Sequence, residues 1–322
     1  GGCQVPMHAV ELDQVTKRFA GRDAVHELSL TVPTGSVCGF LGPNGAGKTT
    51  TLRMIMGILW PDAGRIRLLG ALSPDRARSR LAYLPEERGL YKRMRVLELL
   101  IWLGRLRGLA AAEARTRALR WLERFDLVRV ADDRCETLSK GMGQKVQIAG
   151  ALLHDPELVI LDEPFSGLDP VNVELVRRIV LELRDAGTTV LLSTHVMEQA
   201  EQICDQVLLL HRGRRLLGGP ISEVRAAAQR TLVIDYEGDG AVLAGLPGVR
   251  RLNDAGVHAE LTLEDDADPD AILAALVGRI RIRRFEMVEP SLHEVFVRSV
   301  GADWEEVEAG LQAPDATAEA TV

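Results

Sequence analysis

The chain has 322 residues, of which 46% are hydrophobic, so it is long enough for two domains with sizeable cores. Its net charge of −7 argues against a nucleic-acid partner held by bulk electrostatics. No apolar run reaches the roughly 18–20 residues that a membrane span needs, and no signal-peptide pattern is present. The cysteines lack the spacing of a metal site or disulfide framework and indicate reduced thiols, which together predict a cytoplasmic chain: Cys3, Cys38, Cys135 and Cys204.

Residues 9–31 alternate between apolar and polar side chains, which predicts a short antiparallel β layer. Phe19 lies in this segment. Taken by itself, an aromatic residue in such a layer is more often packed in the core than bound to a ligand.

A glycine-rich loop at residues 42–50 matches the pattern G-x-x-x-x-G-K-[ST] at every fixed position. An apolar strand (residues 37–41) precedes it and a helix-compatible run (residues 51–56) follows it. In this setting the backbone N–H groups of the loop bind a di- or triphosphate, helped by the N-terminal end of the helix. Lys48 would reach the terminal phosphates and the Thr49 hydroxyl would bind Mg²⁺.

The sequence pattern changes from strand-like to helical after residue 81. A short apolar strand (residues 81–85) leads into a charged loop (residues 86–91), and helical periodicity then runs from Val96 to about Leu127. We interpret this as a helical subdomain, at about residues 88–155, inserted in an α/β core. Its many arginines indicate a solvated face or, as an alternative, a surface that binds a partner.

Ser139 and Gly141 come before a predicted helix at residues 146–153, with Ser139 at or just outside its N-cap. Small residues at a helix start can bind an anion. A simple capping turn explains the same residues, so both interpretations stay open from this pattern.

Four apolar residues (158–161) run directly into Asp162 and Glu163. This pattern is typical of a buried parallel strand whose carboxyl end delivers acids to a ligand-binding crevice. Asp162 could hold Mg²⁺ through water, and Glu163 could accept a proton from an attacking water.

A tight turn at residues 166–170, containing Asp169, is followed by a predicted helix at about residues 172–185. A second buried strand then ends in a polar tip at His195. A histidine at that place is either structural or a contact of the γ-phosphate, and the strand pattern does not decide between them.

In this order, these motifs resemble the nucleotide-binding domain of ATP-binding cassette (ABC) transporters over about the first two-thirds of the chain. Residues 42–50 resemble the Walker A loop, residues 158–162 resemble Walker B, and residues 138–142 resemble the family signature. Residues 166–169 are similar to the D-loop and His195 to the switch histidine. Phe19 is similar to the aromatic residue that stacks on adenine.

The resemblance implies that the protein binds ATP and Mg²⁺ and hydrolyses ATP. It implies three catalytic residues, Lys48, Glu163 and His195, and three Mg²⁺ contacts, Thr49, Glu86 and Asp162. The implied nucleotide contacts are Phe19, Asn44, Gly45, Ala46, Gly47, Lys48, Thr49, Thr50, Ser139, Gly141 and Asp169.

Two positions depart from the family pattern. In the signature L-S-G-G-Q, Lys140 and Met142 replace a glycine and the glutamine. Glu86 stands where the family has a glutamine, and a carboxylate can still bind Mg²⁺. The sequence segment around Glu86, residues 83–91, is similar to that of the sodium- and drug-export ATPases of the family.

The final third predicts a small α+β domain at residues 230–300, in the β-α-β-β-α-β order of ferredoxin-like folds with one helix added. Its first helix is expected at residues 241–246. Residues 289–297 are similar to the closing phrase of the accessory domain in those export ATPases. We predict an ATP-binding domain at residues 8–222, and an acidic, disordered tail at residues 301–322.

The resemblance implies an ATP-hydrolysing subunit that works, by ATP-driven dimerisation, with a separate membrane-embedded permease on the inner face of the membrane. The expected assembly is a homodimer, with Ser139 and Gly141 closing the site of the facing copy, and no nucleic-acid partner. The alternative is a soluble ATPase of the same type that acts on ribosomes or DNA. The last domain could be a small-molecule regulator or a module that stabilises the dimer, and the cargo cannot be deduced from these residues.

Overall fold

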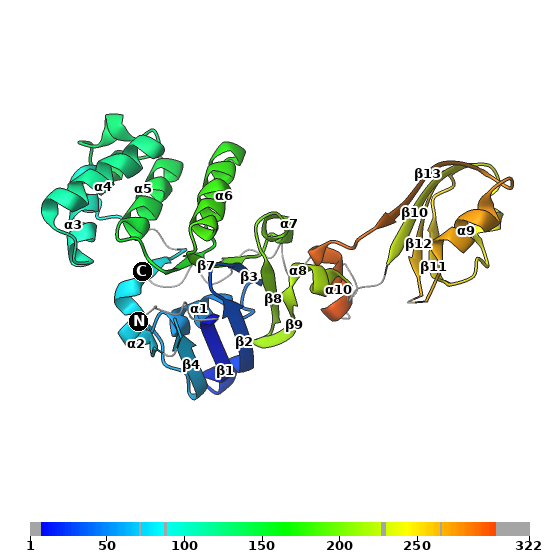
Figure 1. The fold of residues 1–322 in the computed structure, drawn as a ribbon, viewed down its shortest axis with the longest axis horizontal. Helices are drawn as coiled ribbons and strands as arrows, with labels where there is room; N and C mark the ends of the chain where they lie inside the picture. Colours follow the sequence, from blue (N-terminus) through cyan, green and yellow to red (C-terminus); the bar gives the residue numbers. More distant parts are fainter. Residues whose placement is uncertain (1–7, 71, 87–88, 227–229, 265, 301–322) are drawn as a thin grey trace, which may run out of the picture. The chain divides into compact units, whose positions relative to one another are not determined.

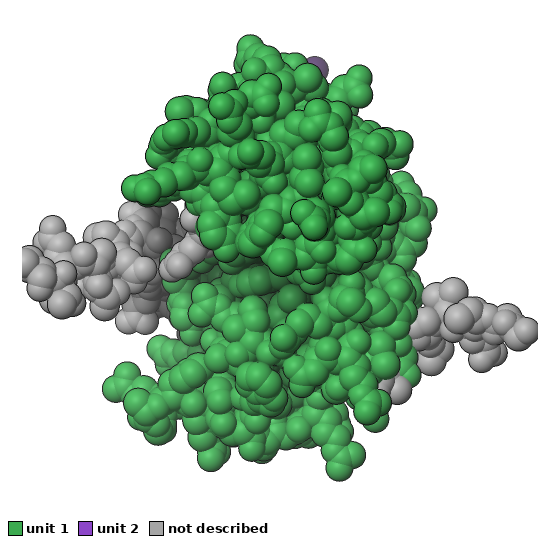
Figure 2. Space-filling view, turned by 90° about the vertical axis from the view of Figure 1, so that its left-hand side faces the viewer, with its two compact units in different colours: residues 1–218, 310–322 green, residues 219–309 purple. Residues whose placement is uncertain are grey.

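A computed structural model describes residues 8–70, 72–86, 89–226, 230–264 and 266–300. The chain divides into two compact units, with the division between Gly218 and Gly219. Figure 2 shows the first unit in green, with a hollow across the middle of the visible face. The domain limits at residues 222 and 230 stay predictions.

The centre of the first unit is a sheet with the strand order β5-β6-β7-β3-β8-β9. Its five strands from β5 to β8 pair in parallel. Strands β3, β6 and β7 are buried along their whole length, as the apolar runs predicted for strands covered on both faces. The bounds are β5 (Leu81–Leu84), β6 (Leu158–Asp162), β7 (Thr189–Thr194), β3 (Val37–Leu41), β8 (Gln206–His211) and β9 (Arg214–Pro220).

The register of this sheet brings three motifs to one edge. Asp162 at the end of β6 pairs with Ser193 on β7, and Leu41 at the end of β3 pairs with Thr194. Because parallel strands end at the same edge, the glycine-rich loop, the two acids and His195 start from neighbouring strand ends.

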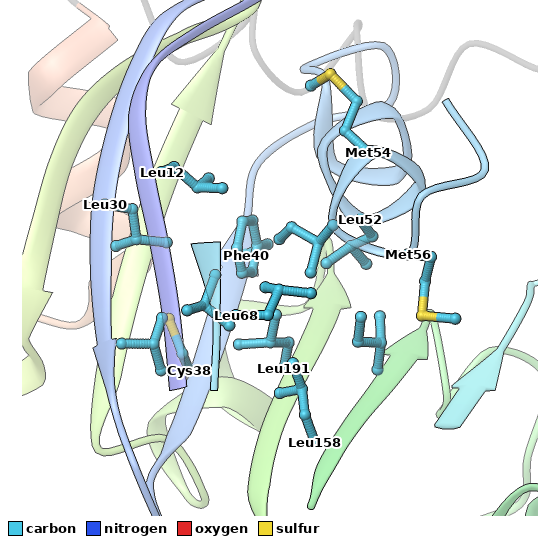
Figure 3. Close-up of a cluster of buried hydrophobic side chains, with 14 of the residues drawn as sticks. Leu12, Leu30, Cys38, Phe40, Leu52, Met54, Met56, Leu68, Leu158 and Leu191 are labelled. Carbon is cyan, nitrogen blue, oxygen red and sulfur yellow. The ribbon is translucent and has the colours of Figure 1, made fainter. Parts of the chain in front are cut away.

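A three-stranded antiparallel sheet confirms the predicted β layer; its order is β2 (Arg22–Pro33), β1 (His8–Phe19) and β4 (Ala63–Leu68). Its apolar face joins one core with the parallel sheet and α1 (Lys48–Ile55), and Figure 3 shows Leu12, Phe40 and Leu52 within that core. The other helices of this part are α2 (Pro74–Ala77), α6 (Pro170–Asp185) and α7 (Met197–Glu201), with a 3₁₀ turn, η1 (Arg78–Arg80).

The inserted helical part contains α3 (Val96–Leu106), α4 (Ala111–Arg124) and α5 (Lys140–Leu152), which lie together on one side of the sheet in Figure 1. The helical periodicity of residues 96–127 corresponds to two helices, because Gly108 adopts a left-handed φ of 91° and separates α3 from α4. Helix α5 begins at Lys140 rather than Val146. Ser139 accepts the N–H of Met142 and starts the helix despite its two glycines, whose low helix propensity misplaced the prediction. Two 3₁₀ turns, η2 (Val128–Val130) and η3 (Cys135–Thr137), connect α4 to α5.

The second unit contains an antiparallel sheet with the order β11-β12-β10-β13, the strand order of a ferredoxin-like fold. One face packs on α9 around Leu261, Ile272 and Leu276. The helix expected at residues 241–246 is the 3₁₀ turn η4 (Gly240–Leu243), because Gly245 and Gly248 with positive φ interrupt it. The bounds are α8 (Ile221–Ala226), β10 (Thr231–Glu237), β11 (Val249–Asp254), β12 (His258–Leu263), α9 (Pro269–Leu276), β13 (Arg281–Val288) and α10 (Leu292–Val300). The predicted tail at residues 301–322 lies outside the described residues.

Candidate active site

The glycine-rich loop connects β3 to α1 in the strand–loop–helix order that the sequence predicted. Gly47, the N-cap of α1, has a φ of 101°, and a Cβ there would lie 2.5 Å from the carbonyl oxygen of Ala24. Gly42 is equally constrained, since its Cβ would lie 2.2 Å from the carbonyl oxygen of Leu210. The loop can therefore keep this curvature only with glycine at both positions.

Lys48 is buried and folds back over the loop. Its Nζ donates to the carbonyl oxygen of Gly42 at 2.7 Å and of Pro43 at 3.3 Å, and lies 3.5 Å from Oε1 of Glu163. Burial lowers the pKa of Lys48, and the charge of Glu163 opposes that shift. Exchanging two neutral carbonyl acceptors for a phosphate would place this buried cation beside a stronger acceptor.

Asp162 is only 2% exposed, and hydroxyl groups surround its carboxylate. Oδ1 accepts from Thr49 Oγ1 at 3.1 Å and from Ser193 Oγ at 2.5 Å, while Oδ2 accepts from the hydroxyl of Tyr83 at 3.4 Å. A hydroxyl from the glycine-rich loop and a carboxylate from β6 therefore meet directly, which is an oxygen pair suited to a hard divalent cation.

Glu163 and His195 form the second pair at this edge. His195 Nδ1 lies 3.0 Å from Oε2 of Glu163, and this contact raises the pKa of His195. The other carboxylate oxygen of Glu163 is buried without a hydrogen bond and faces Lys48. An oxygen that pairs with the Lys48 cation but accepts no hydrogen bond could accept a proton from a bound water.

A cavity of 410 Å³ lies at the glycine-rich loop, and neither Asp162 nor His195 lines it. Its lining residues are Ala24, Pro43, Asn44, Gly45, Ala46, Gly47, Lys48, Thr49, Thr50, Glu86 and Glu163. Burial, and next the charges of Asp162 and Glu163, raise the pKa of Glu86. Three carboxylates thus approach one buried lysine. Because like charges at close range repel, a divalent cation bound here would reduce the repulsion between these carboxylates.

Other predicted site residues do not line this cavity in the described part of the chain. Ser139 caps α5 and Asp169 caps α6, each accepting a backbone N–H of its own helix. Gly141 lies against the side chain of Asn172. Phe19 is 47% exposed at the end of β1, with Lys17 Nζ 5.5 Å from its ring centroid, so it is not a core aromatic.

Sequence reasoning missed three side chains of the site. Ser193 and Tyr83 both bond Asp162, and the buried Gln144 of α5 donates to the carbonyl oxygen of Pro164, directly after Glu163. The signal for Ser193 was present, because it belongs to the polar tip of an otherwise apolar strand. Tyr83 and Gln144 have no such signal, since their partners are distant in sequence.

A phosphate-binding loop, a buried aspartate beside its threonine, and a glutamate–histidine pair on a parallel sheet define an ATPase of the P-loop class. Comparison with proteins of known sequence and structure identifies the family within this class. Residues 25–166 match the family described as ABC transporter, and residues 219–300 match the C-terminal domain of DrrA1-3-like ATP-binding proteins.

An uncharacterised ABC transporter ATP-binding protein of Bacillus subtilis is 41% identical over 295 residues, covering 91% of this chain and 99% of that protein. The Nod factor export ATP-binding protein I of Rhizobium leguminosarum bv. viciae is 36% identical over 303 residues, covering 92% and 96%. The chain belongs to the family of ABC transporter ATP-binding proteins, and it is an ATP-binding ATPase.

Solved structures agree with the fold. An ATP-binding subunit of an ABC transporter superposes with a TM-score of 0.64 at 33% identity, covering 68% of this chain and 92% of that one. The cbiO1 protein of Clostridium perfringens, part of the transporter complex cbiONQ, has a TM-score of 0.61 at 27% identity and covers 68% and 91%. The predicted fold class is confirmed. No helix in the described residues is long and apolar enough to cross a membrane.

Proposed function

We propose that this chain supplies the energy for an exporter, by Mg²⁺-dependent hydrolysis of ATP between two copies of itself bound to a separate permease. The observation that carries the proposal lies at one sheet edge, where Lys48 pairs with Glu163 at the 410 Å³ cavity and Asp162 bonds the adjacent Thr49. The relative named for Nod factor export supports the direction of transport.

Mg²⁺ fits the oxygen donors of this site. Thr49 and Asp162 would hold it, and Glu86, which lines the cavity with Thr49, would add a third oxygen ligand. In the described part of the chain, no group of three or more His, Cys, Asp or Glu residues is placed to hold a metal ion. Mg²⁺ is commonly coordinated by oxygens from both the protein and the phosphates of a substrate. Phosphate oxygens of the nucleotide would therefore complete the site. When bound, the ion supplies charge neutralisation to the phosphates.

The chain's own residues would then perform the reaction. The loop N–H groups and Lys48 orient the phosphates, and Oε1 of Glu163, which accepts no hydrogen bond, accepts a proton from the attacking water. His195, bonded to Glu163, lies ready to donate to the γ-phosphate. Phosphoryl transfer requires mainly this positioning and charge stabilisation.

A second copy would complete the site. Ser139, Gly141 and Asp169 lie outside the cavity that Lys48 lines, on the α5 and α6 starts. Each is solvent-accessible for an approaching chain. We infer that these residues act on the nucleotide of the facing copy, and that a homodimer contains two equal sites.

The permease would bind at a second cavity, of 670 Å³, between the core and the inserted helices. Its walls are mainly apolar and include Tyr91 and Leu106, which are 54% and 63% exposed. Large exposed apolar side chains at a concave surface are typical of partner binding. Leu106→Glu is expected to abolish co-purification with the permease in mild detergent while ATPase activity persists; retained co-purification would contradict this docking surface.

Glu163→Gln tests the catalytic assignment. The amide keeps the size and polarity of the side chain but cannot act as a base, so we expect intact ATP binding and a loss of turnover of about a hundredfold or more. The ATP-bound dimer should accumulate in sedimentation velocity. Glu157→Gln, at the opposite end of β6, is the matched control and should hydrolyse ATP normally. Undiminished hydrolysis by Glu163→Gln would refute the assignment.

A further inference from the structure

Ser193 occupies a fully buried place at the carboxyl end of β7. It has no exposed surface, and the register of the sheet sets it directly opposite Asp162. Its neighbours along β7, Leu191 and Leu192, are buried apolar residues. A hydroxyl at such a position is costly unless it is hydrogen-bonded.

The hydroxyl of Ser193 makes two bonds, one to each of the two consecutive acids. Its Oγ donates to Oδ1 of Asp162 at 2.5 Å and accepts the backbone N–H of Glu163 at 2.9 Å. Both the donor and an acceptor function of the group are therefore used. One atom fixes the side chain of Asp162 and the backbone of Glu163 together.

The backbone of Glu163 needs such a bond. Its φ is 48°, in the left-handed region that disfavours residues other than glycine. The surrounding structure must hold the residue there, because strain of this kind persists only where neighbours determine it. Without Ser193 Oγ, the buried N–H of Glu163 would lose the hydrogen bond recorded for it.

Asp162 depends on the same hydroxyl. Its Oδ1 is shared between Ser193 and Thr49, so the bond from Ser193 orients the carboxylate toward the loop threonine. The charged acceptor makes this a strong, short bond. Loss of the hydroxyl would remove the shortest of the three hydrogen bonds to the carboxylate and leave it held by Thr49 at 3.1 Å and Tyr83 at 3.4 Å.

We propose that Ser193 is a positioning residue that couples the metal-binding acid to the catalytic base. It orients Asp162 toward the divalent cation and Glu163 toward the attacking water. The Ser193 side chain itself contacts neither the cation nor the water. This inference rests on the proposed Mg²⁺-dependent hydrolysis. Bonds to metal ligands of this kind typically contribute about 10- to 100-fold in metal affinity or activity.

The test compares Ser193→Ala with Thr189→Val in the full chain. Thr189 is equally buried on β7, but its hydroxyl lies at the other end of the strand and accepts the N–H of Gly35 at 2.9 Å. Both variants lose one buried hydroxyl, so a purely structural effect should appear in both. The readouts are the Mg²⁺ concentration for half-maximal ATPase activity, kcat, KM for ATP at saturating Mg²⁺, and the Mg²⁺ dependence of binding of trinitrophenyl-ATP.

For Ser193→Ala we expect about a tenfold or larger rise in the half-saturating Mg²⁺ concentration, in hydrolysis and in binding, and a fall in kcat of about tenfold. KM at saturating Mg²⁺ should change by less than about twofold, because Lys48 and the loop are untouched. Thr189→Val should match the wild type in all of these. Equal behaviour of the two variants would overturn the inference, whereas wild-type protein that neither binds nor hydrolyses Mg²⁺–ATP would overturn the proposed function itself.

Discussion

Glu163 combines a left-handed backbone with a buried carboxylate, one oxygen of which accepts no hydrogen bond. The backbone conformation turns the side chain from the strand direction of β6 toward Lys48 and His195. Such strain costs of order 1–3 kcal/mol, and it concentrates at functional sites. The left-handed backbone of Glu163 therefore lowers local stability, and it places the carboxylate where the proposed catalysis requires it.

Glu86 gives the site a pH dependence. Its pKa is raised, chiefly by burial, so it takes up a proton at a higher pH than an exposed glutamate does. A protonated carboxyl is a poor Mg²⁺ ligand. The Mg²⁺ concentration for half-maximal ATPase activity should therefore rise as the pH falls from neutrality into the acidic range.

In Glu86→Gln no proton competes at this position, so the same titration should show a weaker dependence on pH. Half-saturating Mg²⁺ concentrations for the wild type and the variant, measured at both ends of the range, test this. Parallel curves for the two proteins would rule out Glu86 as the titrating group.

Residues marked by a local pattern could be located from the sequence, and residues that reach the site only through long-range contacts could not. The spacing of the loop glycines with Lys48 and Thr49 is a local signal, and so is the run of apolar residues into Asp162. The bond of Tyr83 to Asp162 joins two strands 79 residues apart in sequence, and nothing around Tyr83 marks it.

At the scale of the element, the central strands were predicted well because their burial on both faces leaves a continuous apolar run. Helix α5 was predicted too short, because Gly141 and Gly143 lower the helix propensity that the prediction relies on. Two hydrogen bonds that helix propensity does not take into account stabilise the start of this helix. Ser139 caps the first turn, and Gln144 ties the helix to the segment after Glu163.

The second unit has its own polar anchor. Tyr236 on β10 is 1% exposed, and its hydroxyl donates to both carboxylate oxygens of Asp254 at 2.8 and 2.9 Å. Burial, reinforced by Asp254, raises the pKa of Tyr236 to about 12. The phenol thus remains a neutral donor at physiological pH.

Tyr236→Phe should lower the free energy of unfolding of this unit by about 1.5–3 kcal/mol, because the bond to a charged acceptor is lost. Chemical denaturation monitored by circular dichroism measures the change. Tyr91→Phe removes a hydroxyl from an exposed ring and should have little effect. Equal stabilities of Tyr236→Phe and the wild type would contradict the role of this bond.

At the scale of the whole molecule, the ATP-binding unit presents two separate sets of site residues. Lys48 and Glu163 line the phosphate cavity, whereas Ser139 lies at the start of α5. If one chain formed the whole site, Ser139 would not contact the nucleotide, because it does not line the cavity of its own chain. A site shared between two copies uses both sets and makes hydrolysis depend on association.

Mixing two inactive variants tests this claim most directly. Lys48→Ala removes the phosphate lysine and Ser139→Ala removes the signature hydroxyl, so each homodimer should have two defective sites. A mixed dimer pairs the intact Lys48 of one chain with the intact Ser139 of the other in one of its two sites. We predict that mixing restores ATPase activity which neither variant has by itself; a mixture as inactive as its components would contradict the shared site.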